Sequence, residues 1–253
     1  NHPIPLDLLN EVYSDWEIFF NSNKKHNYPF HKDKQDGYFP FQSENASGYD
    51  KKDLKEFYHI YPNGRYPNMI SKSTKDLYTS LTEIAEILLS WIERNIPQKI
   101  SMKFSMPLSK MVKNSPKNLL RIIHYPAYKG ELEPKQMRIG EHSDYGTITL
   151  LWQINDVPGL QVQDLDGKWH GVPYEQGGVV VNIGDLLQRW TNDYFVSTRH
   201  RVVNTHIDQE RWSMPHFVDP TPGTIISNLR DEPAKYDPIE SKTYLMWRLS
   251  QSY

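Results

Sequence analysis

The chain has 253 residues, enough for one large domain that buries its own core without disulfides. Cysteine is absent, which excludes a disulfide framework, thiolate catalysis and an iron–sulfur cluster. The 29 basic and 31 acidic residues give a net charge of −2 without long runs of one sign, so a nucleic-acid partner is not expected. Apolar stretches fall short of the roughly 18 residues of a membrane span. We expect a cytoplasmic monomer or weak homo-oligomer that acts on a small molecule and binds no membrane.

The first part of the chain is predicted to be helical and irregular. Apolar residues at helical spacing predict a helix over 5–20 and a longer one over 73–95, and a short helix is expected within 101–113. Between the first two helices, 21–72 lack sustained periodicity, which predicts a long irregular segment with short local structure that either covers a substrate site or is disordered. The chain begins with Asn1 rather than methionine, so an incomplete N-terminus is left open.

Short β-prone runs separated by Gly, Pro, Asn and Asp begin after residue 118, and a final helix is expected within 244–253. Such runs are typical of antiparallel sheets that pack on one another with helices on the outside. We therefore predict one mainly β domain with flanking helices over 1–253. Its parts are a helical and irregular segment (1–118), a β core (119–220) and a C-terminal segment with a helix (221–253). The β-prone runs are 119–125, 147–152, 159–164, 177–184, 200–204 and 211–218.

The stretch "GEHSDYG" at 140–146 places His142 two residues before Asp144. On an extended segment such side chains point the same way, so an imidazole nitrogen and a carboxylate oxygen can reach one metal ion. A third ligand is available at the start of a later β-prone run, where His200 stands. Two histidines and one carboxylate leave open positions on Fe(II), although zinc also binds such a set. Taken alone, the pair is more often a polar turn.

A carboxylate clamp follows the last of these histidines. Arg211 and Ser213 alternate onto one face of a predicted strand. A guanidinium fork and a hydroxyl on one face can donate several charge-assisted hydrogen bonds to a carboxylate. An acid anchored there could reach the metal with its other end.

These residues resemble the Fe(II)- and 2-oxoglutarate-dependent oxygenases, in the isopenicillin N synthase-like branch. The matching pieces stand in the family's order and spacing, and the resemblance is strongest over 119–220. They are "HYP" (124–126), "HSDYGTITLL" (142–151), "PGLQVQDLDGKWHGVP" (158–173), "VVNIGDLLQRWTND" (180–193), "STRHRVVN" (197–204) and "RWSMPHFVDP" (211–220).

The resemblance implies a double-stranded β-helix, or jelly-roll, core. Arg211 and Ser213 would hold the distal carboxylate of 2-oxoglutarate, and Tyr125 would add a hydrogen bond to that carboxylate. Ile123 is a departure, since many relatives have at this position an asparagine that contacts the cosubstrate. The Fe(II) ligands would be His142, Asp144 and His200.

The implied reaction is the oxidation of an unactivated C–H bond by O2, as hydroxylation, desaturation or cyclisation, with release of succinate and carbon dioxide. Phe217, in phase with Ser213, resembles a position that lines the substrate pocket. His216 has the opposite phase and is expected to face outward, and His59 is expected on the surface or in a loop. Asn182 is expected in a tight turn with a structural role.

Three alternatives stay open at this point. A relative of isopenicillin N synthase would take no 2-oxoglutarate and would use Arg211 and Ser213 to hold the carboxylate of its substrate. A zinc hydrolase would use the three metal ligands with a bound water and a base such as Glu141, which leaves the clamp without a role. A protein that only binds a small acid would not need all three metal ligands.

Overall fold

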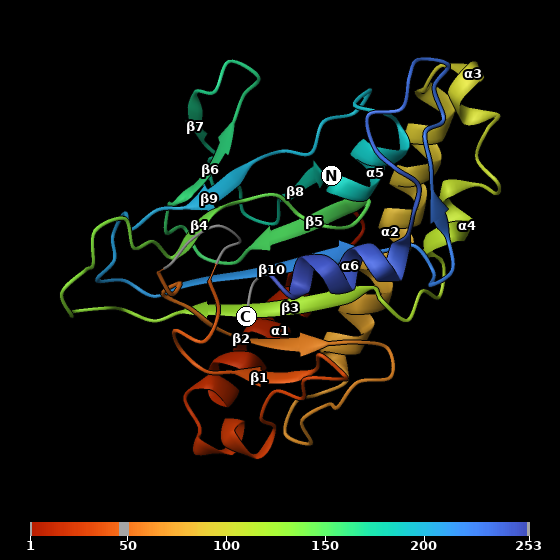
Figure 1. The fold of residues 1–253 in the computed structure, drawn as a ribbon. Coiled ribbons are helices and arrows are strands. Elements are labelled where there is room, and N and C mark those ends of the chain that lie inside the picture. The colour runs from red at the N-terminus through yellow and green to blue at the C-terminus, as the bar shows by residue number, and fades with distance from the viewer. Residues whose placement is uncertain (1, 46–50, 252–253) are drawn as a thin grey trace.

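Two antiparallel sheets form the centre of the computed structural model, which describes residues 2–45 and 51–251 (Figure 1). The larger sheet has the strand order β1 (Gly37–Phe39), β2 (Glu56–Ile60), β3 (Leu119–Tyr125), β10 (Arg211–Val218), β5 (Ile148–Gln153), β8 (Val179–Ile183). The smaller sheet has the order β4 (Ile139–His142), β9 (His200–Val202), β6 (Leu160–Gln163), β7 (Trp169–Gly171). A separate pair joins β11 (Ile225–Ile226) to β12 (Ile239–Glu240). The mainly β fold with a double-stranded β-helix core is confirmed.

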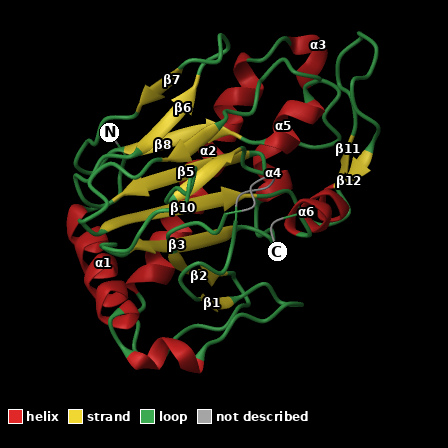
Figure 2. Ribbon diagram, turned by 60° about the vertical axis from the view of Figure 1, so that its left-hand side comes forward, coloured by secondary structure: helices red, strands yellow, loops and turns green. Residues whose placement is uncertain are grey.

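The helices lie around these sheets. The longest, α2, contacts β5 and β10 and passes behind the larger sheet in Figure 2. Within the described residues, no helix is both long and apolar enough to cross a membrane. The helices are α1 (Leu6–Phe20), η1 (Asn23–Asn27), α2 (Ser73–Asn95), α3 (Gln98–Ser101), α4 (Leu108–Val112), α5 (Asp185–Trp190) and α6 (Ser241–Leu249).

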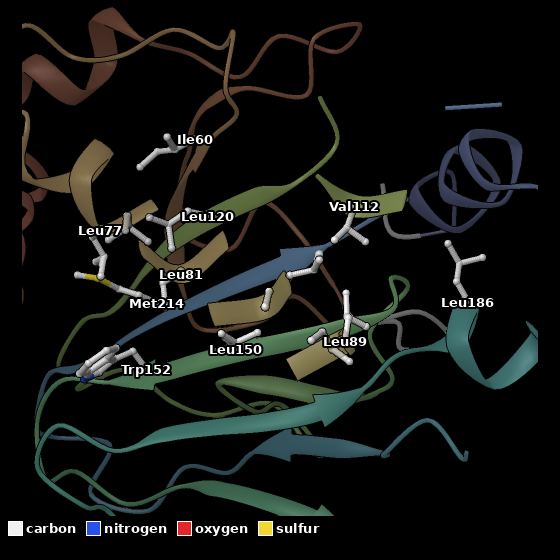
Figure 3. Close-up of a cluster of buried hydrophobic side chains, with 14 of the residues drawn as sticks. Ile60, Leu77, Leu81, Leu89, Val112, Leu120, Leu150, Trp152, Leu186 and Met214 are labelled. Carbon is white, nitrogen blue, oxygen red and sulfur yellow. The ribbon is translucent and has the colours of Figure 1, made fainter. Parts of the chain in front are cut away.

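Alternation along the strands divides the interior into two compartments. Leu120, Leu150 and Met214 point from the larger sheet toward α2, where they meet Leu77 and Leu81 (Figure 3). Side chains of the opposite phase turn toward the smaller sheet and line a cavity between the two sheets. The helix-facing side therefore holds the main hydrophobic core, and the side between the sheets is left for a ligand.

Much of the predicted secondary structure is confirmed. The helices expected over 5–20 and 73–95 are α1 and α2, and each of the six β-prone runs overlaps a strand. The short local structure expected within 21–72 is present as η1, β1 and β2, and the two strands extend the larger sheet, β2 by pairing onto β3 and β1 by pairing onto β2. The short helix expected within 101–113 is α4, a further short helix, α3, precedes it, and the last helix begins earlier than predicted, at Ser241.

Two histidines are buried, contrary to the expectation that they lie outside. His216 faces away from the cavity but is 0% exposed, because α2 covers that face of β10 and brings Thr82 Oγ1 to 3.1 Å from its Nε2. His59 lies on β2 and is 1% exposed, with its Nε2 accepting a hydrogen bond from Arg121 Nε at 2.8 Å. Both errors arise from layers that the sequence pattern did not reveal.

Candidate active site

The three predicted metal ligands meet at one edge of the smaller sheet. His142 and His200 are directly opposed in the register of β4 and β9, with ring centroids 4.2 Å apart. Asp144 follows β4 by two residues, and its Oδ1 lies 3.7 Å from His200 Nε2. One ligand atom from each residue can be chosen so that all three lie within 4.8 Å of one another. The spacing read from the sequence therefore corresponds to a group that could hold a metal ion.

Backbone carbonyls fix the orientation of both imidazole rings. His142 Nδ1 lies 2.9 Å from the Gly140 carbonyl oxygen, and His200 Nδ1 lies 2.9 Å from that of Thr198. A carbonyl can only accept, so each Nδ1 carries the proton and each Nε2 keeps its lone pair for a metal. Burial, together with neighbouring His200, holds the pKa of His142 well below its usual range, which favours the neutral imidazole that metal binding requires.

Asp144 is held by its neighbours on β8 and α5. Asn182 Nδ2 donates to Asp144 Oδ2 at 2.8 Å, and the Asp185 amide donates to the Asp144 carbonyl oxygen at 2.8 Å. Gly184 lets the backbone before Asp185 pass close to the backbone of Gly146, because a Cβ at Gly184 would stand 2.4 Å from the carbonyl oxygen of Gly146. The placement of Asn182 in a tight turn is wrong, because it lies within strand β8, and its side chain orients a candidate ligand.

The predicted carboxylate clamp lies on the neighbouring strands β3 and β10. Arg211 is opposite Tyr125 in the register, and Tyr125 Oη lies 3.3 Å from Ser213 Oγ. Arg211 Nη2 donates to Gln153 Oε1 at 3.0 Å, a partner that the sequence analysis missed. The guanidinium is completely buried, yet its Nε and Nη1 have no hydrogen-bond partner among the described residues. Buried donors of this kind lower the stability of the fold unless a ligand accepts hydrogen bonds from them.

One cavity joins the metal-ligand group to the clamp. Residues at alternate positions of β10, from Arg211 to Phe217, all line it, as does Asp219 directly after the strand, and Phe217 is among them as predicted. Ile123 contributes an apolar wall instead of the asparagine of many relatives. The cavity thus has a clamp end near Arg211 and a distal end near Asp219, with the three candidate ligands also in its lining.

A buried cluster of charged groups, not foreseen from the sequence, forms part of the cavity wall. Lys55 Nζ lies 2.8 Å from Glu44 Oε2 and 2.6 Å from Asp53 Oδ2. Arg121 Nη1 lies 3.3 Å from Glu44 Oε2. Although burial opposes it, Arg121 and Lys55 lower the pKa of Glu44 to about 2. Three of these residues belong to the segment expected to be irregular, so the spacing gave no signal for the cluster.

Asp219, at the far end of β10, was also missed as a site residue. It is 6% exposed, and burial together with Asp144 raises the pKa of its carboxyl to about 7. Its backbone amide donates to Asn118 Oδ1 at 3.0 Å, which fixes the turn after β10. The alternation along β10 carries Asp219 into the cavity lining, a continuation that the sequence could have indicated.

The proposed base of a zinc hydrolase is engaged elsewhere. Glu141 Oε1 accepts from Arg199 Nε at 2.7 Å and lies outside the cavity lining. The opposite phase of Glu141 relative to His142 explains this placement, because successive side chains of a strand point to opposite faces. The hydrolase alternative therefore lacks its general base.

Comparisons with known proteins agree with this geometry. The family model of the 2OG-Fe(II) oxygenase superfamily matches residues 116–220. The chain is 31% identical over its full length to a proline hydroxylase of Petromyces alliaceus, of which it covers 88%. A solved structure of a Shewanella oneidensis protein is 39% identical, with a TM-score of 0.83 over 99% of this chain and 88% of that one. A full-length Neurospora crassa protein, solved in complex with alpha-KG (2-oxoglutarate), is 28% identical, with a TM-score of 0.82 over 99% of this chain and 84% of that one.

The full-length match and the shared fold favour an enzyme over a protein that only binds a small acid, and they favour 2-oxoglutarate over a cosubstrate-free reaction. The chain therefore belongs to the 2OG-Fe(II) oxygenase superfamily, as an enzyme that uses Fe(II) and 2-oxoglutarate to oxidise a small molecule.

Proposed function

We propose that this enzyme holds Fe(II) through His142, Asp144 and His200. We further propose that Arg211 and its neighbours Ser213 and Tyr125 hold the distal carboxylate of 2-oxoglutarate. One observation carries this proposal: the three candidate metal ligands and Arg211 line the same cavity. Two of the three guanidinium nitrogens, Nε and Nη1, have no hydrogen-bond partner among the described residues. The substrate would lie at the distal end, beside Phe217.

The donor set fits the two groups. Two neutral imidazoles and one carboxylate suit Fe(II) and leave other positions on the metal open. A carboxylate placed between the sheets would accept hydrogen bonds from Arg211 Nε and Nη1, for which residues 2–45 and 51–251 offer no acceptor. Ser213 and Tyr125 hydroxyl groups lie next to that guanidinium and can add further donors.

When bound, Fe(II) and 2-oxoglutarate supply O2 activation with oxidative decarboxylation to succinate and carbon dioxide, and so the oxidation of a C–H bond. The chain supplies the geometry. Asn182 orients the Asp144 carboxylate, and Arg211 neutralises and positions the distal end of the cosubstrate. Ile123 and Leu160 line the cavity with apolar surface that excludes water. The reaction requires no side chain as general base.

We also propose that 1–253 acts as one oxygenase domain, with the β core over 119–220. Its support is that Glu44 from the N-terminal part and Leu245 from α6 both line the cavity. The relative named as a proline hydroxylase and the Neurospora crassa protein, which was also solved in complex with thymine, suggest a compact substrate. That the protein lies in the cytoplasm, and that it is a monomer or a weak homo-oligomer, stay predictions.

The proposal is tested by succinate formation after purification under nitrogen. We expect 2-oxoglutarate turnover to be restored by Fe(II) but not by Zn(II), and to be lost in His200→Ala together with iron retention. His170→Ala is the matched control, because His170 lies on β7 outside the cavity lining. Equal activity with zinc, or iron retention unchanged in His200→Ala, would contradict the assignment.

A further inference from the structure

The distal end of the cavity is built from different chemistry than the clamp end. Phe217 is opposite Leu119 in the register of β10 and β3. It is the second residue after Ser213 on the same face of β10. Leu245 reaches the same cavity from α6, and Tyr61 follows β2 into it. A molecule seated there would therefore meet mostly apolar and aromatic side chains, with a small number of polar atoms to fix its orientation.

The charged cluster in the cavity wall reaches the distal end through Arg121, whose guanidinium carbon lies 5.5 Å from the Phe217 ring centroid, and it is balanced within itself. Lys55 and Arg121 supply two positive charges, and Glu44 and Asp53 supply two negative charges at the distances given above. His59 adds no charge, because burial and Arg121 lower its pKa well below the ordinary value. A neutral, internally paired cluster gives little preference for an ionic substrate.

Asp219 differs from that cluster because its carboxyl makes no ion pair within the described chain. Its Oδ1 is buried and has no hydrogen-bond partner among the described residues. Lys117 also lines the cavity and acts on Asp219 only through longer-range attraction. A buried acceptor without a donor is destabilising, and a carboxyl so placed is satisfied best by a group that both donates and carries positive charge.

Tyr61 also favours a polar ligand group near Asp219. Burial and the nearby Asp219 raise the pKa of the Tyr61 phenol, so its hydroxyl stays protonated. That hydroxyl makes no hydrogen bond to the side chains and backbone described in 2–45 and 51–251, and Tyr61 lines the cavity. It adds a second polar atom at the same end, where a polar group of a ligand can sit between the phenol and the carboxyl.

Resting on the proposed function, we propose that Asp219 is a substrate-binding residue that accepts a hydrogen bond from a nitrogen-borne N–H group. The substrate class is then a compact, largely apolar molecule with an amine or amide nitrogen. The apolar body lies against Phe217 and Leu245, and the nitrogen faces Asp219. The oxidised C–H bond is on the part of the molecule nearest the candidate metal ligands.

The test is ligand-observed NMR with four probes that share one ring: cyclohexylamine, cyclohexanecarboxamide, cyclohexanol and cyclohexanecarboxylate. Zn(II) and 2-oxoglutarate are added to prevent turnover, and the series is repeated without them. We expect the two nitrogen probes to bind the wild-type protein, and Asp219→Leu to weaken both by about tenfold or more. At pH 8, where the Asp219 carboxyl is mostly ionised, Asp219→Asn separates the two, because it keeps an acceptor for the amide but removes the charge that favours the amine.

Asp166→Asn, on the exposed turn after β6, is the matched control and should change nothing. Circular dichroism verifies that each variant is folded, and the Asn variant keeps the test valid should the Leu variant unfold. The inference is overturned when neither nitrogen probe binds the wild-type protein, or when binding is indifferent to both Asp219 substitutions. Failure of the proposed clamp appears separately, as a 2-oxoglutarate signal that Arg211→Ala does not reduce.

Discussion

Removing the Arg211 guanidinium should weaken 2-oxoglutarate binding without removing the metal. Its Nε and Nη1 are buried donors without a partner in the part of the chain that the structure describes, and Nη2 is already used by Gln153. Two charge-assisted hydrogen bonds to a carboxylate correspond to about 2–4 kcal/mol after desolvation is counted. Arg211→Ala should therefore raise the Kd for 2-oxoglutarate by roughly 30-fold to 1000-fold. Ser213 and Tyr125 remain, so some affinity is retained.

The assay is an anaerobic titration of the Fe(II) protein with 2-oxoglutarate, compared with 2-oxopentanoate, which has the same chain length but no distal carboxylate. Affinity for 2-oxopentanoate should be nearly equal in the wild-type protein and in Arg211→Ala. Arg211→Lys is the graded variant, since it keeps the charge but loses the planar fork. A folded Arg211→Ala variant that binds 2-oxoglutarate as tightly as the wild-type protein would refute the clamp.

Three further predictions concern the metal and the charged cluster. His200→Ala should abolish iron retention, measured by metal analysis after dialysis. Asn182→Ala should weaken iron binding by roughly 10-fold to 100-fold, because the Asp144 carboxylate loses a hydrogen bond that orients it, and a competition titration with a chelator measures this. Glu44→Gln should lower the free energy of unfolding at pH 7 by about 3 kcal/mol, since it leaves Lys55 and Arg121 underpaired. The folded-state pKa of Glu44 is lowered to about 2, so the stability from its charge is present above about pH 4.5 and is lost as the pH falls toward 2. Urea unfolding at pH 7 and pH 3 should show a smaller difference between wild type and Glu44→Gln at the lower pH, and an equal difference would contradict the pairing.

The candidate metal-ligand group could be named from sequence because its geometry is local to two strands. His142 and Asp144 are two residues apart, and the cross-strand pairing of His142 with His200 follows once β4 and β9 form one sheet. The clamp was predictable for the same reason, since Arg211 and Ser213 share one face of a single strand.

The rest of the site depends on contacts between distant segments, which residue spacing does not encode. β2 is buried at every position, so its sequence "EFYHI" shows no alternation that would indicate a strand. Lys55 and His59 therefore appeared to be loop residues. Gln153 and Asn182 are ordinary polar residues in β-prone runs, and only the fold shows that they contact Arg211 and Asp144.

The most direct test of the site assignment is the visible charge-transfer band that forms when 2-oxoglutarate is added to the Fe(II) protein without oxygen. We predict that the band forms in the wild-type protein, is absent in His200→Ala, and needs much more 2-oxoglutarate in Arg211→Ala. A band of full intensity in His200→Ala, or an unchanged midpoint in Arg211→Ala, would contradict the account.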